Sequence, residues 1–409
     1  MNVSVLVSTE TWGGAEIHTT QLSRTLVARG HSVKVVELGG EQYTNSLKQY
    51  IDSVEFLSLQ RSKALQTIGW IEIYRVLRRL PRDVCIFVKN HFGTGNWKLD
   101  LAARVWFRRY ITIEHMCVPL MPSRSSRRYL GGLVPGVGLW WFRQFIQRWG
   151  RSIGPHLLIT VSEAVRQRLI NAYRYPARKI VTVHGGIDTT KFTPNIQLRQ
   201  DWRAARGFGE DTFVFGAVGR LHEVKGYNLA IELFSALARS MPHRDIRLVF
   251  VGDGPLQEEL KEAAIASGFG DKILFESFTY EPWRVYPGFD VFLMPSTTEA
   301  LGMALLEAMA CGCPPVAMGV GGILEVITHP DTGWVVPEGD RQEFLAAMRS
   351  AVQSTSQKLT HMGLKARRRV VDNFDAKATF ARLTDLIESG TDDGSVAWRK
   401  RIDVLQLKL

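Results

Sequence analysis

The chain has 409 residues, of which 45% are hydrophobic and 22% charged, a composition typical of a globular protein with two domains. Its four cysteines are too few and too irregularly spaced for a disulfide framework, so we expect a reducing, cytoplasmic compartment. The opening segment MNVSVLVSTE lacks the basic start of a secretory signal. The longest uncharged apolar stretch, residues 129–142, is too short to span a bilayer.

The net charge of +11 is unevenly distributed along the chain. Residues 1–190 carry 26 Lys and Arg against 12 Asp and Glu, whereas residues 191–409 carry 25 against 28. The basic half predicts an anionic partner, either a nucleic acid or a membrane surface. Because the chain has no paired-cysteine finger and no aromatic RNA-binding strand, we do not expect nucleic-acid binding.

Strand patterns and helix patterns alternate along both halves. In the first half we predict strands over residues 3–8, 31–38, 84–89, 110–113, 157–161 and 180–183. A helix is expected over residues 15–30, where Gly30 ends it and one face carries Ile17, Leu22, Leu26 and Val27. In the second half the predicted strands are 212–219, 246–252, 272–277, 290–295, 314–318 and 333–337, and a late helix is expected over 376–389.

Apolar strands that alternate with helices indicate parallel sheets covered on both faces. The sequence therefore predicts an α/β protein of two doubly wound domains, residues 1–190 and residues 191–373. Residues 374–409 are expected to form a helix that crosses back to the first domain, followed by a tail. Ligands of such sheets bind where strands end and loops lead into helices, so these loops are the candidate sites.

The loop after the first predicted strand contains Gly13 and Gly14 just before a helix. Two glycines let backbone N–H groups approach a ligand, and a helix start favours an anion. A tight strand-to-helix turn explains the same pair without any ligand, and the loop lacks the G-x-G-x-x-G fingerprint of dinucleotide binding.

The segment GRLHEVKG places Arg220 directly after a predicted strand and Lys225 at the start of the next helix. Two cations at the end of one strand suit a diphosphate, although either alone is more often a solvated surface charge.

The segment STTEALGMALLEAMACGCPPVA contains two carboxylates, Glu299 and Glu307, separated by seven residues. Glu299 is expected in a loop and Glu307 more than one turn into the helix that follows. The N–H groups around Gly302, Met303 and Ala304 open that helix and favour a phosphate. The acids would then accept hydrogen bonds from sugar hydroxyls on either side of it. The alternatives are an acid at the helix start for Glu299 and a surface position for Glu307.

Together these motifs resemble the retaining glycosyltransferases of family 4. The E-x7-E pattern occurs in the expected order with GGAE, VSEAV, HGGIDTTKF, GRLHEVKG, VGDGP and GVGGILEVI. The resemblance implies the GT-B fold, two Rossmann-like domains facing across a cleft. It also implies transfer of a sugar from a UDP- or GDP-linked donor with retention. The segment EALG replaces the EGFG usual in the family, and His184 replaces its usual Asn.

The resemblance also implies roles for individual residues. Arg220 and Lys225 would hold the donor diphosphate, Glu307 the ribose hydroxyls and Glu299 the donor sugar. Gly13 and Gly14 would close over the distal phosphate, and backbone groups near Phe278 would contact the base. His115 would lie near the donor sugar, a packed or capping histidine being the alternative. No metal or other cofactor is expected, because the chain lacks a D-x-D motif.

The acceptor is predicted from the basic first half. Residues 104–151 contain nine arginines and one acid, Glu114. We assign Arg124, Arg127, Arg128 and Trp140 to a surface that faces a membrane or the acceptor, because Trp and Arg at such spacing suit a membrane interface. An amphipathic helix packed on its own sheet is the alternative for residues 139–153.

Three functions remain open at this stage. The first is transfer to a lipid-linked or glycan acceptor in glycolipid, lipopolysaccharide or exopolysaccharide synthesis, with peripheral attachment to the inner face of the plasma membrane. The second is transfer to a soluble small molecule. The third is a non-catalytic subunit that binds a nucleotide sugar.

Overall fold

A computed structural model describes residues 1–8, 14–38, 55–58, 69–89, 97–115, 128–129, 134–135 and 154–389. The chain divides into two compact units, one of Met1–His184 with Phe380–Leu409 and one of Gly185–Thr379. The sequence had placed these limits at residues 190 and 373. The chain therefore leaves the first unit once and returns to it near its carboxyl end.

The first unit is built on a parallel sheet that, within the described residues, has the strand order β3-β2-β1-β4-β5-β8-β9. The six predicted strands are all present. The sequence missed β3, a short strand with polar residues at both ends. The bounds are β1 Asn2–Ser8, β2 Ser32–Glu37, β3 Glu55–Ser58, β4 Val84–Lys89, β5 Arg109–Glu114, β8 Leu157–Thr160 and β9 Ile180–Thr182, with a separate antiparallel pair of β6 Arg128–Tyr129 and β7 Val134–Pro135.

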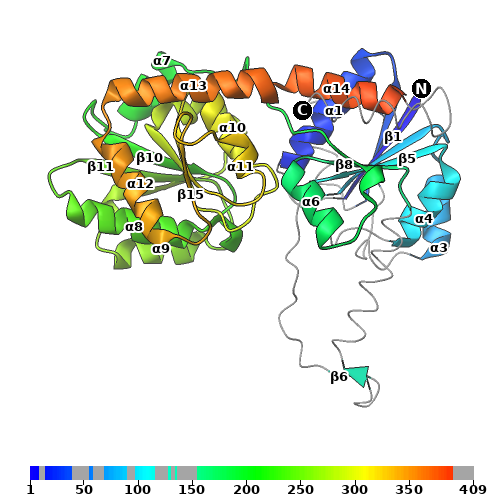
Figure 1. The fold of residues 1–409 in the computed structure, drawn as a ribbon, viewed down its shortest axis with the longest axis horizontal. Helices are drawn as coiled ribbons and strands as arrows, with labels where there is room; N and C mark the ends of the chain where they lie inside the picture. Colours follow the sequence, from blue (N-terminus) through cyan, green and yellow to red (C-terminus); the bar gives the residue numbers. More distant parts are fainter. Residues whose placement is uncertain are drawn as a thin grey trace. The chain divides into compact units, whose positions relative to one another are not determined.

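Helices of the first unit bury one side against this sheet. Their bounds are α1 Gly14–Ala28, α3 Trp70–Leu77, α4 Trp97–Trp106, α6 Glu163–Asn171 and η3 Ala177–Lys179, joined by the later part of α14 Ala376–Glu388. Helix α1 buries Leu22 and Leu26 as predicted, but its buried side also includes the polar His18, Thr19 and Ser23. Helices α3 and α4 lie side by side (Figure 1) and cover a core that includes Leu6, Phe87 and Tyr110.

The second unit has a parallel sheet of order β12-β11-β10-β13-β14-β15. Helices α8, α9 and α12 cover one face, and α10 and α13 pack together on the other (Figure 1). The strands are β10 Phe213–Val218, β11 Ile246–Val251, β12 Ile273–Glu276, β13 Val291–Met294, β14 Pro315–Met318 and β15 Trp334–Val336. The helices are α7 Ile196–Ala204, η4 Glu223–Lys225, α8 Tyr227–Ser240, α9 Gln257–Ala266, η5 Gly270–Lys272, η6 Pro282–Arg284, η7 Tyr286–Gly288, α10 Met303–Ala310, α11 Ile323–Val326, α12 Arg341–Gln353 and α13 Ser356–Phe374.

The order of strands reverses once in each sheet. In the first unit the reversal lies between β1 and β4, and in the second between β10 and β13. Loops that leave adjacent strands on either side of such a reversal run in opposite directions, which opens a crevice at the carboxyl edge of the sheet. The segment after β10 contains the predicted cations, and the segment after β13 contains Glu299 in a loop and Glu307 in α10, so the fold brings the two motifs to one edge of the sheet.

Candidate functional site

Backbone contacts hold together the loops that follow β10 and β13. The Thr297 N–H donates to the Val224 carbonyl oxygen at 2.9 Å. Gly226 has a φ of +67°, and a Cβ at that position would collide with the carbonyl oxygen of Pro295. Only glycine satisfies both the left-handed conformation and the close approach. This contact sets the distance between the two loops, and with it the distance between their side chains.

Lys225 and Glu299 meet across these loops. The Lys225 Nζ lies 2.7 Å from Glu299 Oε1, and the Ser296 hydroxyl donates to the same oxygen at 2.8 Å. The pair is partly buried, so solvent screens it less than it screens a surface ion pair. The sequence predicted Glu299 in a loop, and the structure confirms that position. Ser296 was not predicted, although it stands in the same motif.

Arg220 lies immediately after Gly219 at the end of β10 and is exposed. The Lys225 side chain passes beside Gly219, where a Cβ would lie 3.7 Å from Lys225 Cε. Among the residues that the structure describes, no carboxylate pairs with Arg220. Its guanidinium is therefore available to an anion at the edge of the crevice.

The loop after β14 closes on the backbone of Glu299 from another side. The Gly322 N–H donates to the Glu299 carbonyl oxygen at 3.4 Å. Gly321 has a φ of +53°, and a Cβ there would collide with the same oxygen. The GVGG segment thus fixes the backbone that carries this acid.

Glu307 lies more than one turn into α10, as predicted, and is buried. The Tyr286 hydroxyl donates to Glu307 Oε2 at 2.6 Å. Burial raises the pKa of Glu307 to about 7, against the lowering effect of the Tyr286 hydrogen bond. The predicted surface alternative for this acid is therefore wrong. Tyr286 was missed because it precedes Glu307 by 21 residues and carries no motif of its own.

The start of α10 presents the backbone donors expected there. The first helical bonds run from the Leu305 and Leu306 N–H groups to the Gly302 carbonyl oxygen. The N–H groups of Gly302, Met303 and Ala304 precede these bonds, so they lie in the part of a helix that favours an anion. After β12, the Phe278 ring is 44% exposed and packs edge-on against Tyr280 with ring centroids 4.8 Å apart.

In the first unit, His115 follows β5 and is half-buried. Burial lowers its pKa to about 4, so the ring is neutral at physiological pH. Its ring lies edge-on to His18 of α1, with centroids 4.5 Å apart. Burial and the neighbouring His115 hold the pKa of His18 well below its usual value. His18 was not predicted, because the prediction for this segment concerned only Gly13 and Gly14.

Comparison with known proteins identifies the family. A family model described as Glycosyltransferase Family 4 matches residues 12–191, and one described as Glycosyl transferases group 1 matches residues 199–369. The GDP-mannose-dependent alpha-(1-6)-phosphatidylinositol monomannoside mannosyltransferase of Mycolicibacterium smegmatis is 30% identical over 69% of this chain and 75% of its own length. The D-inositol 3-phosphate glycosyltransferase of Geodermatophilus obscurus is 30% identical over 90% of this chain and 85% of its own length.

The chain belongs to glycosyltransferase family 4. Its fold is GT-B, as the crystal structure of Anabaena HepE also indicates, with a TM-score of 0.78 at 20% identity over 95% of this chain and 100% of that chain. HepE was solved in complex with UDP and also with UDP-glucose.

Family membership does not by itself explain a second polar cluster in the transferase. Lys89, the last residue of β4, donates to Asp100 Oδ1 at 2.8 Å and lies 3.7 Å from Glu114 Oε1. The Tyr110 hydroxyl donates to the same Asp100 oxygen at 2.5 Å. All four side chains are buried. Glu114, the last residue of β5, thus lies against Lys89 at the carboxyl edge of the first sheet.

Several predicted residues of the transferase cannot be placed. Gly14 begins α1, whereas Gly13, Arg124, Arg127 and Trp140 lie outside the described residues. Arg128 belongs to β6, and only its backbone is described. In the part of the chain that the structure describes, no helix has the length and apolar character needed to cross a membrane.

Proposed function

We propose that this glycosyltransferase moves a hexosyl group from a UDP- or GDP-linked sugar to its acceptor, with retention at the anomeric carbon and without a metal ion. The observation that carries the proposal is the ion pair of Lys225 with Glu299 at the strand-order reversal of the second unit, where the Lys225 side chain passes beside Gly219, the residue before the exposed Arg220. A cation pair, a helix start and an acid at one crevice suit a diphosphate that bears a sugar.

In this proposal Lys225 and Glu299 give up their mutual ion pair when the donor binds. Lys225 and Glu299 satisfy each other in the free protein. A diphosphate would give Lys225 and Arg220 an anionic partner, and sugar hydroxyls would donate to Glu299. Glu307, held by Tyr286, would accept hydrogen bonds from the ribose hydroxyls, while backbone groups near Phe278 contact the base. The comparison with HepE, which was solved with UDP-glucose, favours a uridine donor.

The chemical step breaks the bond between the anomeric carbon and the diphosphate oxygen. Negative charge develops on the leaving diphosphate, and Arg220, Lys225 and the N–H groups at the start of α10 would stabilise it. The departing phosphate would accept the proton of the acceptor hydroxyl as the new glycosidic bond forms on the same face. We propose that His115 lies near the donor sugar, where a neutral ring can donate or accept a hydrogen bond.

The acceptor is proposed from the relatives. One of them acts on phosphatidylinositol monomannoside, a lipid, and this choice agrees with the basic first half of the chain. We therefore propose a lipid-linked or glycan acceptor, in glycolipid or polysaccharide synthesis, reached from the cytoplasmic side of a membrane. The alternative is a soluble acceptor, as the D-inositol 3-phosphate relative would suggest.

A panel of sugar nucleotides tests the donor part of this proposal. A ligand that binds only the folded state adds stability that grows with the logarithm of its concentration over Kd, about 2.7 kcal/mol at a hundred times Kd. We expect the melting temperature to rise with a UDP-sugar or a GDP-sugar and not with the free sugar. Slow hydrolysis of that donor without acceptor would exclude a non-catalytic subunit. If no sugar nucleotide shifts the melting temperature, the proposal fails.

A further inference from the structure

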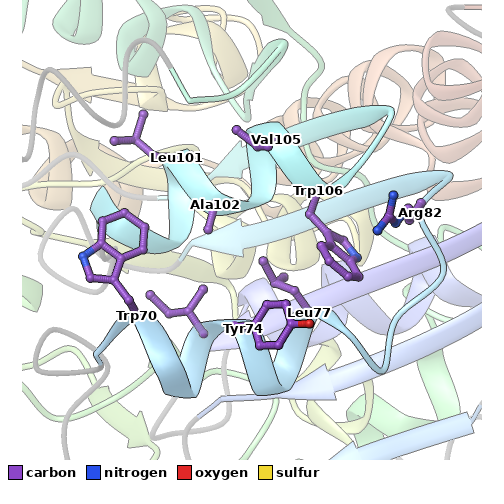
Figure 2. Close-up of a pocket in the computed structure, with 9 residues that line it drawn as sticks. Trp70, Tyr74, Leu77, Arg82, Leu101, Ala102, Val105 and Trp106 are labelled. Atoms are coloured by element: carbon purple, nitrogen blue, oxygen red, sulfur yellow. The ribbon is translucent and has the colours of Figure 1, made fainter.

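A groove runs between α3 and α4 in the first unit (Figure 2). We call it the α3–α4 groove; its volume is about 570 Å³, and its lining residues are Trp70, Ile73, Tyr74, Leu77, Arg82, Leu101, Ala102, Val105 and Trp106. All but Arg82 are apolar or aromatic. The groove belongs to neither of the two polar clusters described above.

The floor of the groove is part of the hydrophobic core. Ile73 and Leu77 of α3 are buried in the core that the two helices share with the sheet. On the walls of the groove, Trp106 contacts both Tyr74 and Arg82. The Tyr74 ring packs edge-on to Trp106 with centroids 6.2 Å apart, and the Arg82 guanidinium lies 4.3 Å from the Trp106 ring.

Large apolar side chains at the mouth of the groove are exposed. The exposed fractions are 50% for Trp70, 58% for Tyr74 and 88% for Val105, which line the groove, and 69% for Ile71, which follows Trp70 on α3. They cluster on two adjacent helices, whereas a single exposed apolar residue needs no explanation. A contiguous apolar patch with a polar rim marks an interaction surface.

The two helices that form the groove, and the residues that follow them, carry many exposed arginines, of which Arg82 lines the groove itself. Exposed arginines on and beside the two helices are Arg75, Arg78, Arg79, Arg82, Arg104 and Arg108. Within the described residues, the exposed acid of α3 and α4 is Glu72, whose carboxylate accepts a hydrogen bond from the Gly69 N–H at 3.1 Å. Asp83, nearby, accepts hydrogen bonds from Asn2. The surface therefore complements a negatively charged partner.

We propose that the α3–α4 groove docks on the surface of an anionic bilayer, with Trp70, Tyr74 and Val105 at the level of the lipid headgroups. Trp and Tyr suit this boundary because each has an apolar ring and a polar tip. The exposed arginines on and beside these two helices would contact lipid phosphates. The residues of this surface are other than those that the sequence assigned to a membrane, Arg124, Arg127, Arg128 and Trp140. The proposal rests on the proposed function only for the idea that docking brings the enzyme to a lipid-linked acceptor.

Charge also decides against a second copy of the chain as the occupant. In a two-fold symmetric dimer the same patch meets itself, so the arginines of one copy would face those of the other. Their repulsion is not offset by acids on the described parts of these helices. A bilayer rich in acidic lipid presents a continuous negative surface instead.

Sedimentation with vesicles tests the proposal. The probes are vesicles of phosphatidylcholine alone and of phosphatidylcholine with phosphatidylglycerol, each at low and at physiological salt. We expect binding to the anionic vesicles only, weakened by salt. Replacing Arg75, Arg78 and Arg79 together by Gln should lower the partition coefficient by roughly a hundredfold, at roughly fivefold for each arginine. Val105→Glu should lower it roughly tenfold or more, because an apolar contact becomes a charge.

Matched variants on the second unit provide the controls. Arg239, Arg244 and Arg368 are exposed, and their triple Gln variant loses the same charge. Ile265 is exposed on α9, and Ile265→Glu matches Val105→Glu. Both controls should bind like the wild type. If the wild type does not bind anionic vesicles, the proposal is overturned. It is also overturned if variants and controls lose binding equally, because another surface would then account for the attachment.

A probe at Val105 separates the bilayer from other occupants. In a Cys117→Ser background, Val105→Cys labelled with a polarity-sensitive dye should report water in the free protein and an apolar environment with anionic vesicles. An apolar signal without vesicles would mean that protein already covers the groove, and the proposal would fail. None of these assays needs a sugar nucleotide. Failure here therefore leaves the donor proposal standing, and the melting-temperature shifts with the panel of UDP- and GDP-sugars test that proposal on the same samples.

Discussion

Tyr286 and Glu307 illustrate how one residue can prepare another for a ligand. Burial favours the neutral form of the Glu307 carboxyl, while the hydroxyl of Tyr286 favours the ionised form. The net result is a pKa of about 7, where a small change in surroundings decides the charge. Hydrogen bonds donated by ribose hydroxyls favour the ionised form of this carboxyl, so a bound ribose would lower its pKa.

Glu307→Gln should change how stability depends on pH. The pKa of Glu307 is about 7 in the folded protein and 4.5 ordinarily. Between these values the unfolded chain releases a proton that the folded state keeps, so this group lowers stability as pH rises from about 4.5 to about 7. The total is roughly 3 kcal/mol, at 1.36 kcal/mol for each pKa unit. Urea unfolding across this range should show the loss in the wild type and not in the Gln variant.

Tyr286→Phe is the control for this prediction. It removes a hydrogen bond that lowers the pKa of Glu307, so the pH range over which stability falls should extend upward. Identical pH slopes in the wild type and the Gln variant would contradict the shifted pKa of Glu307.

Arg220→Ala should lower transfer strongly without weakening the fold. The side chain is exposed, and in the described part of the chain it forms no ion pair with an acid that the substitution would break. Losing one donor aimed at a developing negative charge typically costs roughly 3–4 kcal/mol, or about 10²–10³ in kcat. Lys225→Ala should cost a similar amount, and it should also lower stability because Glu299 loses its ion pair. Initial rates with saturating donor and acceptor, together with urea midpoints, measure both effects.

Arg244→Ala, another exposed arginine of the second unit, is the comparison and should leave the rate unchanged. A rate within a few-fold of wild type for Arg220→Ala would show that this side chain does not meet the leaving group.

At the scale of elements, the loops after β10, β13 and β14 form one assembly. Gly226 brings the first two together, and Gly321 presses the third onto the backbone of Glu299. These close approaches leave no room for a side chain. The position of the Glu299 carboxylate therefore depends on Gly226 and Gly321, which have no side chain that could contact the donor.

Gly321→Ala should destabilise the protein and weaken donor binding. A Cβ at this position would collide with the Glu299 carbonyl oxygen, and its φ of +53° strains any residue with a side chain. Gly268→Ala is a matched control, because Gly268 has a φ of +81° and no atom within 4 Å of the added Cβ. The control should cost roughly 1 kcal/mol and keep its affinity for the donor. Equal effects of the two substitutions on donor affinity would show that Gly321 does not position Glu299.

The elements themselves were largely predictable from the sequence, because buried parallel strands are apolar runs bounded by turn residues. β3 escaped because Glu55–Ser58 is short and half polar. The candidate site was predictable where one motif contains its residues, as with Arg220 and Lys225. Pairings between distant segments were not predictable from the sequence. Those of Tyr286 with Glu307 and of Lys89 with Asp100 and Glu114 depend on how the strands and helices pack.

At the scale of the whole molecule, charge is divided between the two halves of the chain. The basic first half contains the α3–α4 groove and its arginines, whereas the nearly neutral second half contains the candidate donor site. A dianionic leaving group in the second half needs positive charge from nearby groups. Local cations and helix starts can supply it, or a divalent metal can.

The charge available in the second unit leads to our last prediction, that transfer does not require a divalent metal. Arg220 and Lys225 would supply the positive charge that a metal ion held by carboxylates supplies elsewhere, and these cations would repel Mg²⁺ or Mn²⁺. The N–H groups that begin α10 add a further fixed positive field. Initial rates after dialysis against excess EDTA should equal those with added Mg²⁺ or Mn²⁺, while a magnesium-dependent phosphatase treated in the same buffer loses its activity. If EDTA abolishes transfer and either metal restores it, the diphosphate is neutralised in another way and the assignment of Arg220 and Lys225 is wrong.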